Sequence, residues 1–237
     1  RKSLIILGIF TILILGLRLF LAFSSPYFTY DAYNTLIDVE RISESGAPLF
    51  YDDLFAGGRV QVFAPVFPYV LAFFNLFLDS DLVGKVIPNL FAVSLIFILY
   101  FLGKTIIKHD GLSLILGIVS GFLPLFFVKT LHTVSVFTFF LPLFFLLIYA
   151  FLNLDKKYAT TLYVVLLFVL GFTHPTSLLL LPVFVFYAVL LVLDSLHVSK
   201  AEIELMLFSV FALIWMHLLV YKKALLQHGV SVIWQNT

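Results

Sequence analysis

A carboxylate flanked by two tyrosines is the most chemically suggestive feature of this sequence. The stretch FTYDAYN places Tyr30, Asp31 and Tyr33 directly after a long apolar run. A carboxylate at the end of a helix bundle can act as a general base or bind a divalent cation. Tyrosine hydroxyls and rings can contact a sugar or a phosphate. Alternatively, Asp31 caps the following helix by accepting a backbone N–H, and the two roles are compatible.

Cations and histidines elsewhere in the chain suit the binding of a phosphate. Arg18 lies near the end of the first apolar run, where a charge is costly in a bilayer. It either extends to the lipid headgroups or pairs with Asp31 or with a lipid phosphate. Lys129 and His132, in FFVKTLHTVS, can hold a phosphate, although such a lysine can also simply anchor a helix end. His174, in GFTHPTS, can be an acid, a base or a phosphate contact, or a turn residue that faces solvent.

Three other sites carry weaker signals. Asp52 and Asp53 are adjacent, so their side chains diverge and do not form a two-carboxylate cation site by themselves. The GGR sequence that ends at Arg59 can form a turn that presents a guanidinium to phosphate, but no helix N-terminus is evident after it. His217 has apolar neighbours, and we expect it to hydrogen-bond another helix.

Composition sets the class of protein. The chain has 237 residues, of which 62% are hydrophobic and 11% are charged. An ordinary soluble domain carries about 25% charged residues, so this chain is predicted to be an integral membrane protein. A net charge of +1 offers no basic stripe for nucleic acid. The absence of cysteine excludes disulfides and cysteine-ligated metals.

Apolar runs predict the spans. A transmembrane helix needs about 20 mostly apolar residues. We therefore expect a single-domain, all-α bundle with about seven spans, at 4–23, 86–103, 111–128, 134–152, 158–173, 176–193 and 203–221. A further run at 62–78 contains Pro65 and Pro68, and it either crosses the membrane or lies along its interface.

The orientation depends on that run. Arg1 and Lys2 predict a cytoplasmic N-terminus, which leaves the acidic loop after the first span outside, and we expect the membrane to be the plasma membrane. If 62–78 does not cross, this first extracytoplasmic loop comprises residues 24–81. In that arrangement Asp31, Lys129 and His174 all reach the outer face, together with His132. If 62–78 crosses, Asp31 lies on the opposite side from the others. The distribution of lysine and arginine slightly favours the first arrangement.

An amphipathic helix is predicted inside this loop. Polar residues recur at positions 31, 34, 38 and 41, while Ala32, Leu36 and Val39 occupy the opposite side. This spacing is typical of a helix that lies flat on a membrane. Gly46 and Pro48 then predict its end.

The order of these segments resembles the GT-C superfamily of membrane glycosyltransferases, especially the archaeal relatives of the oligosaccharyltransferase catalytic subunit. The resemblance begins with RLFLAFSSPYFTYDAYN and the amphipathic DVERISESG. It continues through PLFYDDLFAGGR, FAPVFPYVLAFF and VIPNLFAVSLIFILYFLGKTIIKHDG. SGFLPLFFVKTLHTVS and FTHPTSLLLLP complete it.

The resemblance implies a function and a set of ligands. The donor would be a sugar or glycan linked to a polyprenyl phosphate in the membrane, and the acceptor would lie on the extracytoplasmic face. Asp31 matches the family's catalytic or metal-binding carboxylate, which makes Mg²⁺ or Mn²⁺ a candidate cofactor. Tyr30, Tyr33 and Arg59 would contact the substrate, and the Pro-rich run would lie along the membrane.

Two departures from the family keep an alternative open. KTLHTVSVFTFF contains no acid where relatives carry a second acidic motif, which weakens the case for a cation because hard cations take several oxygen ligands. Relatives also continue beyond the length of this sequence, so we expect an N-terminal part, a short member or a non-catalytic subunit that binds lipid or a membrane protein partner. A transporter is disfavoured, because its polar groups should lie near the midplane in repeated halves.

Overall fold

The structure is a computed structural model that describes residues 2–47, 51–52, 59–60, 64–193 and 199–228. It consists of two compact units. The first contains residues 1–48 and 65–152, and the second contains residues 49–64 and 153–237.

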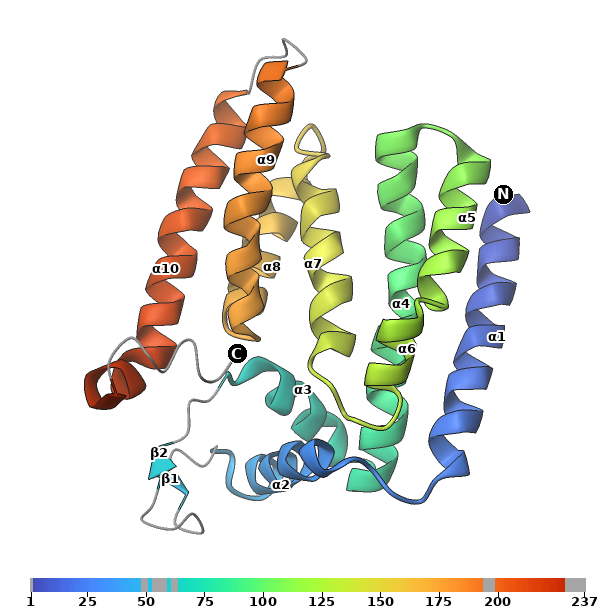
Figure 1. The fold of residues 1–237 in the computed structure, drawn as a ribbon, viewed down its shortest axis with the longest axis vertical. Helices are drawn as coiled ribbons and strands as arrows, with labels where there is room; N and C mark the ends of the chain where they lie inside the picture. Colours follow the sequence, from blue (N-terminus) through green and yellow to red (C-terminus); the bar gives the residue numbers. More distant parts are fainter. Residues whose placement is uncertain (1, 48–50, 53–58, 61–63, 194–198, 229–237) are drawn as a thin grey trace. The chain divides into compact units, whose positions relative to one another are not determined.

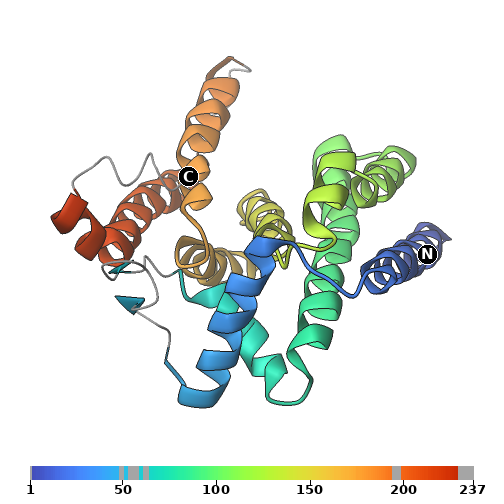
Figure 2. The ribbon, with the colours of Figure 1, turned by 60° about the horizontal axis from the view of Figure 1, so that its bottom comes forward.

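The first unit is organised around one long helix. This helix, α4 (Ser80–Ile107), packs against α1 (Lys2–Ser24), α5 (Asp110–Gly121) and α7 (Phe137–Phe151). The short helix α6 (Pro124–Thr130) follows α5. Two further helices, α2 (Tyr30–Ser45) and α3 (Val66–Asn75), lie side by side across one end of these helices (Figures 1 and 2).

Small residues allow α5 to approach its neighbours closely. A Cβ atom added to Gly117 would lie 2.8 Å from the carbonyl oxygen of Ile96 on α4. One added to Gly121 would lie 2.6 Å from the side chain of Ile14 on α1. Close packing at small residues is the usual way in which apolar helices associate where water provides no driving force.

A polar cluster joins the other ends of the same three helices. The Asp110 carboxylate accepts hydrogen bonds from Ser3 on α1 and from the Tyr100 hydroxyl on α4, the latter at 2.8 Å. Lys104 Nζ lies 3.3 Å from the same carboxylate. The pKa of Asp110 is lowered to about 2. The hydrogen bond from Ser3 contributes most, followed by the one from Tyr100 and by Lys104.

The predicted amphipathic helix is confirmed as α2. Ala32, Leu36 and Val39 are buried as expected. The helix ends where the sequence predicted, because Gly46 adopts a left-handed conformation with φ 72° and donates its N–H to the carbonyl of Ile42. Glycine adopts this conformation without the steric penalty of a Cβ atom.

The Pro-rich run at 62–78 does not form a spanning helix. Its helical part, α3, has 10 residues, which corresponds to about 15 Å at 1.5 Å per residue. The hydrocarbon core of a bilayer is about 30 Å thick. The length of α3 therefore agrees with the arrangement in which this run does not cross.

The helical membrane class is confirmed, but the count of seven spans is not. Among the described residues, four helical segments are long and apolar enough to cross a membrane, namely Lys2–Ser24, Ser80–Ile107, Pro175–Leu193 and Lys200–Lys222. The predicted span at 111–128 is interrupted between α5 and α6, because Pro124 has no N–H with which to continue α5. Helices α5, α7 and α8 (Ala159–Gly171) have 12, 15 and 13 residues.

The second unit contains α8, the 3₁₀ helix η1 (Pro175–Leu179), α9 (Leu180–Leu193) and α10 (Lys200–His228). It also contains a two-residue antiparallel pair, β1 (Tyr51–Asp52) with β2 (Arg59–Val60), which the sequence did not predict. Helix α8 packs on α10, where the hydroxyls of Tyr163 and Ser209 lie 2.5 Å apart.

A capping box begins α10. The Glu202 carboxylate accepts from the backbone N–H of Ser199 at 2.6 Å, and the Ser199 hydroxyl accepts from the N–H of Glu202. This reciprocal pair satisfies two N–H groups that the helix leaves unpaired. The Tyr187 hydroxyl of α9 also donates to Glu202, at 2.6 Å, so the same carboxylate joins the two helices.

The α4–α5 contact predicts the effect of one added methyl group. Gly117→Ala should destabilise the protein by about 1–3 kcal/mol, because its Cβ overlaps the Ile96 carbonyl. Gly8→Ala is the matched control, since nothing lies within 4 Å of an added Cβ there. Thermal unfolding in detergent measures both, and equal midpoints in the two variants would show that the contact is not tight.

Candidate functional site

The start of α2 is hydrogen-bonded to the loop that follows α6. The backbone N–H of Thr29 donates to the carbonyl of His132 at 3.0 Å, and the Thr29 hydroxyl lies 3.4 Å from the same oxygen. The two residues are 103 positions apart in the sequence. This contact brings the segment that carries Asp31 beside the loop that carries His132, which directly follows the last turn of α6 with Lys129. That these residues face the outside of the membrane stays a prediction.

Asp31 does not cap α2. The N-cap residue is Thr29, which has an extended conformation, and no side-chain cap hydrogen bond is formed there. Asp31 lies in the first turn of the helix and is exposed. A carboxylate in this position interacts favourably with the positive end of the helix dipole, and its exposure leaves it accessible to a substrate.

Tyr33 is held close to the start of α2. Its hydroxyl accepts from the backbone N–H of Phe28 at 3.4 Å, and its ring meets the Phe28 ring edge-on with centroids 6.0 Å apart. The side chain is 42% exposed, so part of its surface can contact a ligand. The side chains of Tyr30 and Arg59 lie outside the part of the structure that is described.

Arg18 is buried instead of extending to the headgroups or pairing with Asp31. Its side chain is 1% exposed. Nε donates to Asn89 Oδ1 and Nη2 donates to Thr130 Oγ1, both at 2.7 Å. The guanidinium also lies 4.8 Å from the centre of the Phe127 ring. With this burial Arg18 has almost no surface to offer a substrate phosphate.

Lys85 is a second buried cation, and the sequence analysis did not single it out. It is 8% exposed, and Nζ donates to the carbonyl of Ser25 at 3.0 Å. The ammonium lies 5.3 Å from the centre of the Phe23 ring. The sequence GKVIPNLF could have indicated this site, because it places Lys85 and Asn89 one helical turn apart. In the structure Asn89 Nδ2 donates to the Lys85 carbonyl at 2.7 Å.

Arg18 and Lys85 place two buried positive charges at this end of the first unit. In the described part of the chain, neither Arg18 nor Lys85 has a carboxylate within ion-pair distance. Buried charges act through a low-dielectric environment, so their field is screened less than that of surface charges. Lys129, which is exposed in the last turn of α6, adds a third positive charge.

The loop after α6 contains a strained residue. Val134 has a positive φ of 46° and is 3% exposed. A β-branched residue rarely adopts this conformation, and such strain costs about 1–3 kcal/mol. The contacts around the loop must therefore hold it in place.

His174 belongs to the second unit. It is the N-cap of η1, and its Nδ1 accepts from the backbone N–H of Thr176 at 3.2 Å. The ring is half-buried. Burial, and then the charge of His217, lower the pKa of His174. His217 itself is 2.7 Å from the carbonyl of Leu213 on its own helix.

The described residues do not form a metal centre. No group of three or more histidine, aspartate and glutamate side chains among them is arranged to hold a metal ion. The backbones of Asp52 and Arg59 lie opposite each other in the short ladder, while the side chain of Asp52 and the whole of Asp53 lie outside the described part of the structure. Asp31 therefore does not belong to a group of three such ligands among the described residues, whereas Mg²⁺ or Mn²⁺ takes several oxygen ligands.

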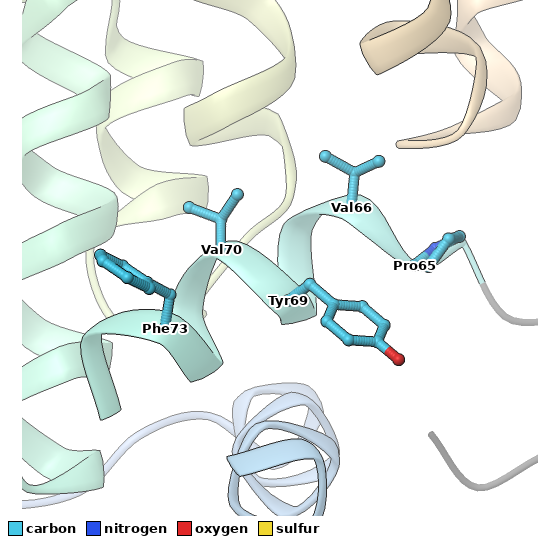
Figure 3. A pocket seen from close by; sticks show the side chains of 5 residues that line it. All are labelled: Pro65, Val66, Tyr69, Val70 and Phe73. Carbon is cyan, nitrogen blue, oxygen red and sulfur yellow. The ribbon is translucent and has the colours of Figure 1, made fainter. Parts of the chain in front are cut away.

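An open apolar groove lies on α3, next to the end of α2. It has a volume of about 480 Å³, and its lining consists of Pro65, Val66, Tyr69, Val70 and Phe73 (Figure 3). The Tyr69 hydroxyl donates to the Gly46 carbonyl at 3.0 Å, which ties the groove to α2. A groove with this lining suits a hydrocarbon chain.

Comparisons with models of known protein families and with curated proteins find no match to this chain. Its function is therefore inferred from its own residues and contacts.

The environment of His174 predicts a pH dependence of stability. Its folded pKa lies below the unfolded value of about 6.5. As the pH falls through about 6.5, the unfolded chain binds a proton that the folded chain does not, so stability is lost. His174→Asn keeps a good N-cap residue and should reduce this loss. Thermal unfolding at pH 7.5 and pH 5.5 measures it, and an equal loss in both proteins would refute the assignment.

Proposed function

We propose that this protein is a membrane glycosyltransferase. It would move a sugar or glycan from a polyprenyl-phosphate-linked donor to an acceptor on the extracytoplasmic face. The observation that carries the proposal is the hydrogen bond from Thr29 N–H to the His132 carbonyl. It keeps a carboxylate-bearing helix start beside the loop that carries His132, directly after the end of α6 that carries Lys129. A carboxylate, a lysine and a histidine suit the transfer of a group away from phosphate.

In this reaction Asp31 orients the acceptor and removes its proton as a general base. Lys129 and His132 stabilise the negative charge that develops on the phosphate leaving group, which is usually the largest electrostatic contribution to such catalysis. The buried cations Arg18 and Lys85 have too little exposed surface to touch the donor. Arg59 and His174 belong to the second unit, and their role as phosphate contacts stays a prediction from the sequence.

The lipid part of the donor needs an apolar surface close to these groups. The groove on α3 is apolar and is connected to α2 through Tyr69 and Gly46. We assign the first part of the polyprenyl chain to this groove. A divalent cation is not required in this scheme, because Asp31 acts as a base and lysine supplies the positive charge.

A non-catalytic membrane subunit that binds lipid or a partner protein is the second candidate. The described residues favour it in one respect, since they contain no cluster of metal ligands. Relatives of the kind that the sequence resembles use such a cluster. The two candidates differ in whether any sugar is transferred.

Substitution of the carboxylate tests the proposal. Asp31→Asn removes the base while keeping the shape of the side chain, and it should lower kcat for transfer from a polyprenyl-phosphate sugar by about 10²–10⁴-fold. The assay uses the purified protein in liposomes with a water-soluble acceptor.

Glu40→Gln is the matched control. It makes the same chemical change at another exposed position of α2, and its rate should equal that of the unaltered protein. Full transfer by a folded Asp31→Asn protein would refute the proposal, and the absence of transfer with any donor would favour the non-catalytic subunit.

A further inference from the structure

We infer that Arg18 is a positioning residue. It holds the loop after α6 through Thr130, and this loop in turn holds the start of α2 and Asp31. The effect on catalysis rests on the proposed function, whereas the positioning itself does not.

A continuous path of contacts links Arg18 to the start of α2. Nη2 of Arg18 donates to Thr130 Oγ1 at 2.7 Å. Thr130 is the last residue of α6, two positions before His132. The His132 carbonyl accepts from the N–H of Thr29, which is the N-cap of α2. Asp31 is the second residue of that helix.

The geometry of Thr130 suits this role. Its hydroxyl donates to the carbonyl of Phe126 at 2.6 Å, so its lone pairs remain to accept from Arg18. A guanidinium is always charged and has a planar set of donors, which lets Arg18 bind Asn89 on α4 and Thr130 on α6 at once. A lysine ammonium cannot reproduce this planar arrangement.

The strain at Val134 explains why the loop needs an anchor. A valine with φ 46° favours a return to negative φ. The Arg18–Thr130 bond fixes the residue before the loop, and the Thr29–His132 bond fixes its middle. If the first bond is lost, we expect the loop to relax and the second bond to weaken.

A second anchor acts on the segment between α1 and α2. Lys85 donates to the Ser25 carbonyl, and Asn89 donates to the Lys85 carbonyl. Asn89 therefore connects both anchors, since it also accepts from Arg18. The start of α2 is held from both sides by groups that do not reach the substrate.

Disulfide trapping tests the positioning directly. The chain contains no cysteine, so Thr29→Cys and His132→Cys can be introduced as one pair. The shorter hydrogen bond between these residues, at 3.0 Å, joins backbone atoms that the cysteines keep, whereas the substitution removes only the longer contact of the Thr29 hydroxyl at 3.4 Å. Cross-linking under mild oxidation in detergent then reports how closely the two segments are held.

The cross-linking rate of this cysteine pair is compared between three proteins, which carry native Thr130, Thr130→Val and Thr130→Ser. Thr130→Val removes the acceptor of Arg18 and should slow cross-linking at least fivefold, whereas Thr130→Ser keeps the hydroxyl and should restore the original rate. Thr130→Ala gives the same test if valine disturbs folding. An unchanged cross-linking rate in a folded Val or Ala protein would overturn the inference.

The activity of the single variants separates the two claims. With native Thr29 and His132, Thr130→Val should lower kcat with little change in KM for the donor, and Thr130→Ser should not. If the Val and Ser proteins cross-link differently but no protein transfers sugar, the positioning stands and the proposed function fails. Slower transfer with unchanged cross-linking would overturn the positioning alone.

Discussion

A buried guanidinium, Arg18, constrains the whole first unit, because no carboxylate among the described residues forms an ion pair with it. Removing a charge from water costs several kcal/mol unless hydrogen bonds compensate for the lost hydration. Asn89 and Thr130 supply these bonds to Arg18, and the Phe127 ring covers one face of the guanidinium. Helices α1, α4 and α6 must therefore keep their positions relative to one another, because a shift of any of them would leave the charge unpaired.

This constraint also positions the loop after α6 and, through it, the start of α2 that carries Asp31. The loop after α6 begins at the residue that Arg18 binds, and the same loop accepts the hydrogen bond from the start of α2. An exposed carboxylate, Asp31, thus lies on an element held by buried polar groups, while Lys129 remains exposed.

Periodicity made some of these features predictable and left others out of reach. The inner face of α2, with Ala32, Leu36 and Val39, follows from helical spacing alone. Pro124 in the sequence indicated the break after α5. The span predicted at 111–128 rested on the number of apolar residues alone and therefore missed this break. The burial of Arg18 was not predictable, because its two acceptors are 71 and 112 positions away. Thr29, rather than Asp31, is the N-cap of α2, because its backbone is extended and the helix begins at the next residue, Tyr30.

Binding of the lipid phosphate tests the central claim most directly. Native mass spectrometry of the purified protein with added polyprenyl phosphate measures this binding without requiring turnover. The account predicts a complex that Lys129→Gln weakens at least tenfold and that Glu40→Gln leaves unchanged. Equal binding by the Lys129→Gln protein, or no binding by the unaltered protein, would contradict it.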